Sequence, residues 1–191
     1  MPISSPETSL SLLEQLREPD APDAWARLVR IYTPLLHLWL HTAGLQQADR
    51  DDSIQRALEI LLKRLPEFEH TGQPGSFRAW LRRIIVNLLR EFWRRRPTPD
   101  SGSVLNQLED CHSSLSRLWD KQHDQHVLHG LLELIEPEFP EATWQAFRRV
   151  ALDGASARSV AAEMGKTVNA VLIAKSRVLA RLRQEAEALV D

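Results

Sequence analysis

The chain contains 191 residues, of which 43% are apolar and 26% charged, and its formal net charge is −2 at neutral pH. This is the composition of a soluble globular protein with one domain of average size or two small ones. The only cysteine, Cys111, excludes an intramolecular disulfide framework and a zinc site built on several thiolates, and we interpret it as an incidental thiol rather than a redox sensor. Residues 1–16 lack the basic and apolar regions of a secretion signal, and no later run approaches the ~20 apolar residues that span a bilayer. We therefore expect a cytoplasmic protein that does not insert into a membrane.

Helical periodicity dominates the first half of the chain, where strand signals are absent. Residues 23–40 carry apolar side chains at helical spacing, with Pro34 as a kink or a break. A second helix is predicted over residues 48–65, because its first turn is rich in aspartate, whose negative charge suits a helix N-terminus. Gly72, Pro74 and Gly75 then predict a loop.

The most regular apolar pattern follows this loop and predicts a third helix. Its large apolar residues recur every three or four positions, at Phe77, Trp80, Leu81, Ile84, Ile85, Leu88, Leu89 and Phe92. Ser76 is placed to cap this helix, which would be about 30 Å long at 1.5 Å per residue. Its apolar stripe is expected to pack on the first two helices.

The second half of the chain begins with a turn-rich segment, residues 97–103, which predicts a linker. Helical pattern resumes weakly over residues 115–119 and strongly over residues 127–135 and 142–151. The block after it has the form of a helix-turn-helix. In that block Ser156 caps a short helix, Gly165 permits a left-handed turn, and a second helix begins at Val168.

The charged residues are segregated along the chain although the net charge is small. Two basic segments are separated by an acidic stretch over residues 100–141. The first basic segment contains Arg78, Arg82, Arg83, Arg90, Arg94, Arg95 and Arg96 against Glu91. The second contains Arg148, Arg149, Arg158, Lys166, Lys175, Arg177, Arg181 and Arg183 against Asp153 and Glu163. Two such segments indicate two surfaces that face a polyanion, joined by a stretch that avoids it.

These motifs together resemble a known family, the extracytoplasmic-function (ECF) subfamily of bacterial sigma-70 RNA polymerase sigma factors. The run from Asp52 to Gln55, then Phe68, the loop and the stretch 77–87 resemble the second conserved region of that family. Residues 154–165 and the following helix resemble its fourth region. The resemblance covers residues 25–96 and 127–183 in the family's order, which makes it more specific than a helix-turn-helix alone.

The resemblance implies an all-α protein of two small helical domains joined by a flexible linker. We expect a sigma region 2 helical bundle over residues 10–97, the linker over residues 98–122 and a sigma region 4 helix-turn-helix over residues 123–187. The implied function is to bind core RNA polymerase and direct promoter recognition, DNA melting and transcription initiation, without catalytic residues, metal or cofactor. The implied partners are the beta-prime clamp helices and the beta flap of core polymerase, promoter DNA and an anti-sigma factor.

Two groups of residues take their expected roles from region 2 of the family. The core polymerase-binding residues would be Asp49, Asp52, Gln55 and Glu59, because exposed polar groups on a regular helix suit docking on a coiled coil. The residues implied for minus-ten recognition are Phe68, Glu69, His70, Thr71, Gly72, Gln73, Arg78, Arg83, Asn87, Arg90 and Arg94. In the family this loop receives a flipped base, and the amide of Asn87 would donate to and accept from a base edge. Periodicity assigns Trp80 and Phe92 to the core and leaves Phe68 open between core and base contact.

The last helix would read the minus-thirty-five element from the major groove. At 100 degrees per residue, its buried side is predicted to be Val168, Val171, Leu172, Leu179 and Leu182. The residues expected to contact DNA are Arg158, Lys166, Thr167, Asn169, Ala170, Ile173, Ala174, Arg177 and Arg181. The chain departs from the family at Leu172, Ile173 and Ala174, where basic or hydroxyl residues are common. Apolar groups there would either contact thymine methyls or make DNA binding weaker and more selective.

Two other functions remain open from the sequence. A helix-turn-helix regulator that works without polymerase would bind an operator tightly by itself, but this reading leaves Asp52, Gln55 and Asn87 unexplained. A helical metallohydrolase would use the local cluster of His123, Asp124, His126 and His129, which otherwise reads as a solvated surface. Metal analysis of the purified protein separates the second alternative from the first.

Overall fold

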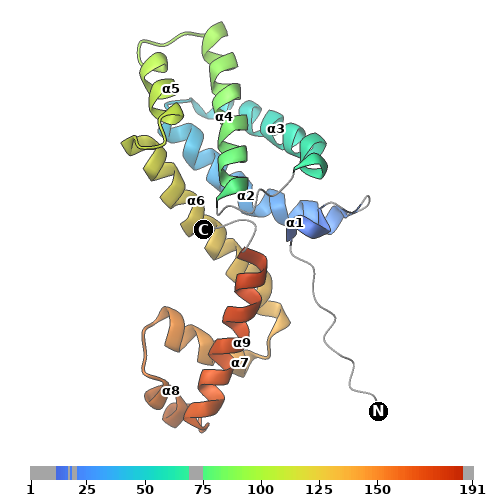
Figure 1. Ribbon diagram of the computed structural model, residues 1–191, viewed down its shortest axis with the longest axis vertical. Coiled ribbons are helices and arrows are strands. Elements are labelled where there is room, and N and C mark those ends of the chain that lie inside the picture. The colour runs from blue at the N-terminus through green and yellow to red at the C-terminus, as the bar shows by residue number, and fades with distance from the viewer. Residues whose placement is uncertain (1–11, 17, 19–20, 69–74, 187–191) are drawn as a thin grey trace. The chain divides into compact units, whose positions relative to one another are not determined.

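The computed structural model describes residues 12–16, 18, 21–68 and 75–186 (Figure 1). In these ranges the chain forms helices and contains no strand, which confirms the predicted all-α class. The chain divides into two compact units: the first extends to Leu128, and the second begins at His129. None of the helices described combines the length and the apolar character needed to cross a bilayer.

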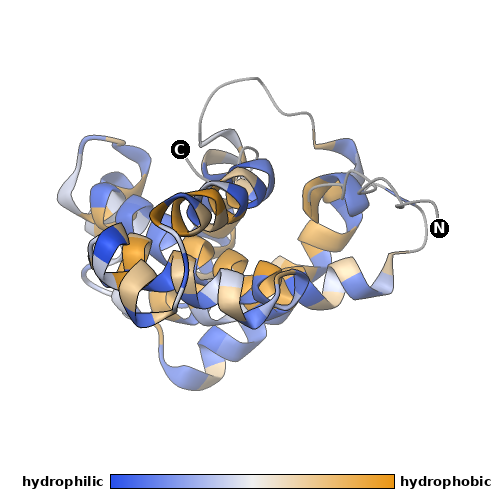
Figure 2. Ribbon diagram, turned by 90° about the horizontal axis from the view of Figure 1, so that it is seen from below, coloured by the Kyte–Doolittle hydropathy of each residue, from blue (hydrophilic) through white to orange (hydrophobic). Residues whose placement is uncertain are grey.

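The first unit is built on three long helices close to those predicted. They are α2 (Pro22–Thr42), α3 (Gln47–Arg64) and α4 (Ser76–Arg95), and they are accompanied by the single turn α1 (Leu12–Gln15) and the 3-10 turn η1 (Leu65–Glu67). Pro34 lies inside α2 on its exposed side, so it does not end the helix. Apolar and hydrophilic residues alternate along the helices (Figure 2), and the buried positions of each long helix recur with helical period, so that it carries an apolar stripe.

The apolar stripes of α2, α3 and α4 form the core of the first unit. Tyr32 and Trp39 of α2, Leu61 of α3, and Phe77 and Ile85 of α4 are all completely buried. The ring of Tyr32 meets that of Phe77 edge to face at 5.5 Å between centroids. This core fixes the orientation of α3 and α4, whose opposite faces are exposed.

The N-terminus of α4 is set by a glycine rather than by the serine cap that the sequence suggests. Gly75 is the cap residue and has φ 70, in the left-handed region that a residue with a Cβ rarely adopts. Ser76 is already the first helical residue, and its buried hydroxyl makes no capping hydrogen bond. The predicted capping role of Ser76 is therefore wrong, because the turn at Gly75 lets the helix begin one residue earlier, at Ser76 itself.

The segment expected to be a flexible linker contains two helices that belong to the first unit. They are α5 (Ser101–Glu109) and the first part of α6 (Ser114–Ile135). Trp119 of α6 is completely buried, stacks on Trp39 at 4.5 Å between ring centroids, and donates its indole N–H to Thr42 Oγ1 at 3.0 Å. This segment thus packs on α2 instead of acting only as a tether.

The second unit contains the predicted short helix, turn and long helix. After the end of α6 come the 3-10 turn η2 (Glu136–Glu138), α7 (Glu141–Phe147), the π-helical turn η3 (Arg148–Leu152), α8 (Ala157–Glu163) and α9 (Val168–Ala186). Ser156 caps α8 by accepting a hydrogen bond from the Ser159 N–H at 3.1 Å, and Gly165 has φ 62, as predicted. The core of this unit includes Ala146, Val160, Ala161, Val171 and Ala174.

Candidate functional site

One exposed face of α3 gathers the polar residues expected to dock on polymerase. Asp52, Gln55 and Glu59 follow one another at three and four residues, so they lie on the same face, and all three are exposed. Asp49 is different: its carboxylate pairs with Arg96 at 2.9 Å and its side chain is only 23% exposed. The helix therefore presents Asp52, Gln55 and Glu59 outward, while Asp49 joins α3 to the end of α4.

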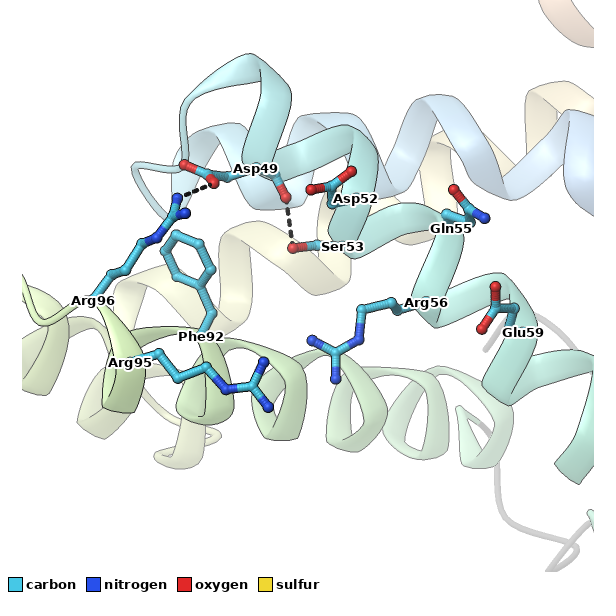
Figure 3. Close-up of a pocket in the computed structure, with 9 residues that line it drawn as sticks. All are labelled: Asp49, Asp52, Ser53, Gln55, Arg56, Glu59, Phe92, Arg95 and Arg96. Carbon is cyan, nitrogen blue, oxygen red and sulfur yellow. Dashed lines mark hydrogen bonds and ion pairs between the residues drawn. The ribbon is translucent and has the colours of Figure 1, made fainter.

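The space between α3 and α4 is a cleft of about 380 Å³ whose lining combines both charges (Figure 3). Arg56 of α3 reaches Glu91 of α4 at 2.8 Å, and Arg95 contacts the same carboxylate at 2.6 Å. The side chain of Phe92 extends from α4 into this region in Figure 3 and is half-buried rather than part of the core. The Arg56–Glu91 pair bridges the two helices, whereas Arg95 and Glu91 lie one turn apart on α4.

Leu62 is a feature of this face that the sequence reasoning missed. It lies three residues after Glu59, on the same side of α3, and is 54% exposed. A large apolar side chain among exposed polar residues marks a contact surface. The sequence signal for Leu62 is its helical spacing from Gln55 and Glu59, which places it on the same face of the helix.

An aromatic cluster lies on both sides of the predicted specificity loop. Phe68, which follows η1, is buried and contacts Phe77 and Trp80 of α4 at 5.5 and 5.0 Å between ring centroids. Trp80 itself is half-buried. The cluster resolves the position of Phe68 in favour of the core. The predicted minus-ten residues Glu69, His70, Thr71, Gly72 and Gln73 lie outside the described residues.

The basic side of α4 is only partly open to solvent. Arg78 is 13% exposed and pairs with Asp124 at 2.8 Å and with Asp120 at 3.3 Å, and Arg82 is 14% exposed and pairs with Asp120. Both aspartates belong to α6. Arg78, predicted to contact DNA, is thus held in an ion-pair network inside the first unit.

The remaining predicted residues of α4 lie farther along the same helix and are exposed. They are Arg83, Asn87, Arg90 and Arg94. Arg90 donates to Asn87 Oδ1 at 2.6 Å and also pairs with Glu109 of α5. Asn87 keeps its amide nitrogen as a donor while its oxygen accepts from Arg90, which suits it to a base edge.

His123 is the buried centre of the contact between α6 and the core. Its ring is completely buried, with Nε2 3.4 Å from the Tyr32 hydroxyl and Nδ1 3.1 Å from Asp124 Oδ1. Burial lowers the pKa of His123 below its ordinary value, and the hydrogen bond and charge of Asp124 oppose this only in part. Burial alone would raise the pKa of Asp124, but the His123 hydrogen bond and the charge of Arg78 hold it below its ordinary value.

The stability of the first unit is expected to fall below pH 6.5, the ordinary pKa of histidine. In that range His123 is protonated in the unfolded chain but stays neutral in the folded protein until the pH reaches its lower folded-state pKa. Lowering the pH therefore favours the unfolded state. One such group accounts for at most about 1.4 kcal/mol per pH unit. Urea unfolding at about pH 7.5 and about pH 5.5 should show a smaller loss for His123→Gln than for the wild type.

The exposed His129 supplies the control for this experiment. It lies on the same helix and its side chain is 74% exposed, so His129→Gln makes the same chemical change outside the buried contact between His123 and Tyr32. If the free energy of unfolding depends on pH equally in the wild type and in His123→Gln, the loss of stability at low pH does not come from His123.

The His and Asp cluster on α6 does not form the solvated surface that the sequence suggests. His123 is buried and Asp124 pairs with Arg78, whereas His129 lies 3.2 Å from Glu133. Within the described ranges, no three His, Cys, Asp or Glu side chains are grouped so that they could hold a metal ion.

The predicted faces of α9 need correction. Ala174 is 9% exposed and packs in the core of the second unit, and Val178 is fully buried. Leu172 and Val168, predicted to be buried, are 47% and 41% exposed. Small Ala174 allows the helices to approach closely, so the buried stripe runs through Val171, Ala174, Val178 and Leu182.

Arg181, predicted to contact DNA, also lies on the inner side of α9. Its side chain is 12% exposed and pairs with Glu138 at 2.7 Å and, one turn away, with Glu185. The other predicted residues of this group are exposed, namely Arg158, Lys166, Thr167, Asn169, Ala170, Ile173 and Arg177. Thr167 Oγ1 accepts from the Ala170 N–H at 3.1 Å and so caps α9.

Comparison with known proteins identifies the helical segment that carries the polar and basic faces. Residues 28–97, which contain most of α2 and all of α3 and α4, match the family model of sigma-70 region 2. A search of curated proteins found no match to the chain. The exposed face of α3 and the basic face of α4 both fall within the segment that matches sigma-70 region 2.

Proposed function

We propose that the protein is a sigma factor of the ECF type, which acts in the cytoplasm by binding core RNA polymerase and directing promoter recognition, DNA melting and transcription initiation. The observation that carries this proposal is the pair of faces within the region 2 match. One is the exposed polar face of α3, and the other is the arginine-rich side of α4.

The proposed polymerase contact is the face formed by Asp52, Gln55, Glu59 and Leu62. It combines negative charge, a hydrogen-bonding amide and one exposed apolar side chain, which suits docking on the beta-prime clamp helices. Asp49 supports this contact indirectly, since its carboxylate holds Arg96 at the end of α4.

The proposed minus-ten contact is the exposed part of α4. Arg83, Asn87 and Arg94 would bind the melted strand, because arginines neutralise phosphates and an amide reads a base edge. Phe68 packs against Phe77 in the core and is therefore left out of the proposed base contacts.

The second unit would bind the beta flap and read the minus-thirty-five element with α9. The exposed residues at the start of this helix combine Asn169 with apolar Leu172 and Ile173, while Lys166 and Arg177 supply positive charge. An asparagine suits adenine and apolar groups suit thymine methyls, so Leu172 replaces Ala174 and Arg181 among the proposed contacts. An anti-sigma factor that covers these faces would provide regulation.

Reconstitution with core polymerase tests the proposal directly. The full chain should co-elute with core enzyme and start transcription at defined positions on a library of bacterial promoter fragments. Absence of both core binding and specific initiation would exclude a sigma factor. Tight and specific DNA binding by the chain without polymerase would instead favour the helix-turn-helix regulator.

Asn87→Ala is expected to impair promoter opening more than initial promoter binding. The side chain is exposed on α4, so its loss should remove a base contact that exists only after melting. Permanganate footprinting of the holoenzyme should show opening reduced about tenfold, the loss expected for one hydrogen-bonded base contact, while closed-complex formation changes less. Equal losses in binding and opening would contradict this role.

A further inference from the structure

Acidic residues of α5 and α6 pair with the basic side of α4 along much of its length. Arg78 donates to both carboxylate oxygens of Asp124, at 2.8 and 2.9 Å. Arg82 pairs with Asp120, and Arg90 with Glu109. Three arginines of the proposed DNA-facing helix are therefore matched by carboxylates from a segment of the same chain.

These pairs border a cleft of about 550 Å³. One side is lined by Arg78, Arg82, Arg83, Val86, Asn87 and Arg90 of α4, and the other by Leu108, Glu109, Cys111 and Asp120. A DNA strand that contacts Arg83 and Asn87 would bring phosphates toward the same guanidinium groups that the carboxylates now contact. Carboxylates and phosphates compete for these groups because both are bidentate acceptors for arginine.

The two ends of this acidic segment differ in how firmly they are held. At the α6 end, Trp119 and His123 are fully buried, and the side chains of Arg78 and Arg82 are 13% and 14% exposed. At the α5 end, the Arg90 and Glu109 side chains are 52% and 49% exposed. Exposed ion pairs contribute little to stability, so Arg90–Glu109 is the pair that a polyanion would break first.

We propose that α5 and its turn to α6 act as an internal competitor for DNA on α4, so that nucleic acid binding requires Glu109 to release Arg90. The inference rests on the proposed function, since it concerns regulation of the same α4 surface. It assigns a role to the acidic stretch that the sequence suggested would avoid a polyanion. The free protein binds single-stranded DNA weakly because α5 covers part of its contact surface.

The test compares Glu109→Gln with the wild type in the full chain. Binding of a fluorescein-labelled single-stranded oligonucleotide should tighten about two- to fivefold, the change expected when one exposed ion pair stops competing. Glu18→Gln is the matched control, because Glu18 is also exposed and the substitution removes the same charge outside α5 and α6. Affinity that rises equally in both variants, or in neither, would overturn the proposal.

The lone cysteine offers a second readout in the same chain. Cys111 is exposed at the turn between α5 and α6 and lines the cleft, so an environment-sensitive fluorophore attached there reports on that turn. Emission should change along the same titration as oligonucleotide binding, and Glu109→Gln should shift the change to lower DNA concentration. Emission that stays constant while DNA binds would overturn the displacement of α5.

Failure of this inference is distinguishable from failure of the proposed function. If the wild type starts transcription with core polymerase but Glu109→Gln binds the oligonucleotide no more tightly than Glu18→Gln, the competitor is excluded and the sigma factor stands. If the chain does not bind core polymerase at all, the proposed function fails whatever the oligonucleotide shows.

Discussion

Gln55→Ala and Asp52→Ala are each expected to weaken binding to core RNA polymerase by about tenfold or more, with a parallel loss of transcription at limiting protein. Both side chains are exposed on the same face of α3 as Leu62, which is 54% exposed and would supply the apolar part of the contact. Truncating one partner of a hydrogen-bonded polar pair that is buried in an interface leaves the other partner unpaired, which is the physical reason for the expected loss. Affinity is measured by competition against a labelled wild-type chain for core enzyme.

The chain offers a matched control for the glutamine. Gln125 is exposed on α6, within the first unit, so Gln125→Ala makes the same chemical change away from α3. It should leave the affinity for core polymerase within about twofold, and all variants should keep the wild-type free energy of unfolding, because surface substitutions change it by about 0.5 kcal/mol or less. If neither Asp52→Ala nor Gln55→Ala changes core binding or transcription, the assignment of this face to polymerase is wrong.

The helices of the first unit could be predicted because their apolar stripes are long and regular. α2, α3 and α4 begin and end within about two residues of the predicted bounds, the scatter expected for helix ends. The local signals in the second unit were equally reliable, since Ser156 caps α8 and Gly165 adopts the left-handed turn. In each case the residues that determine the helix, cap or turn lie within a few positions of it in the sequence.

The faces of α9 were harder to predict, because the assignment followed the size of the side chains. Ala174 is buried since a small residue lets α9 approach its neighbours closely, whereas the larger Leu172 remains 47% exposed. The helical wheel at 100 degrees per residue placed Arg181 on the outside, but Glu138 and Glu185 pair with it on the inner side. The charge or size of a side chain predicts whether it is buried or exposed only where no residue of another helix pairs with it or packs against it.

The packing of α5 and α6 on the first unit depends on contacts between residues far apart in the sequence. Trp119, His123 and Val127 recur every four residues and are all fully buried, a pattern that the acidic composition of the segment obscured. The pairs between Arg78 and Asp124 join residues 46 positions apart. Such pairing leaves no local signal, so the sequence indicated a linker where the structure has a packed helix.

Trp119→Ala is expected to lower the free energy of unfolding of the first unit by about 3–5 kcal/mol, the usual cost of truncating a buried tryptophan. The side chain is completely buried, its ring lies 4.5 Å from that of Trp39 between centroids with an interplanar angle of 6°, and its N–H donates to Thr42 at 3.0 Å. Truncation loses the stacking and the hydrogen bond together and leaves a cavity against α2. Urea unfolding followed by far-ultraviolet circular dichroism measures the loss without relying on tryptophan emission.

The neighbouring Leu118 is the control for this substitution. It is 42% exposed on the same helix, so Leu118→Ala should change the free energy of unfolding by about 0.5 kcal/mol or less. Similar small effects for both variants would show that α6 does not pack on α2 and that residues 98–122 behave as the linker the sequence suggested. A large effect for Trp119→Ala alone would show that the first folding unit extends at least to Trp119, well beyond Pro97, in agreement with the division of the chain after Leu128.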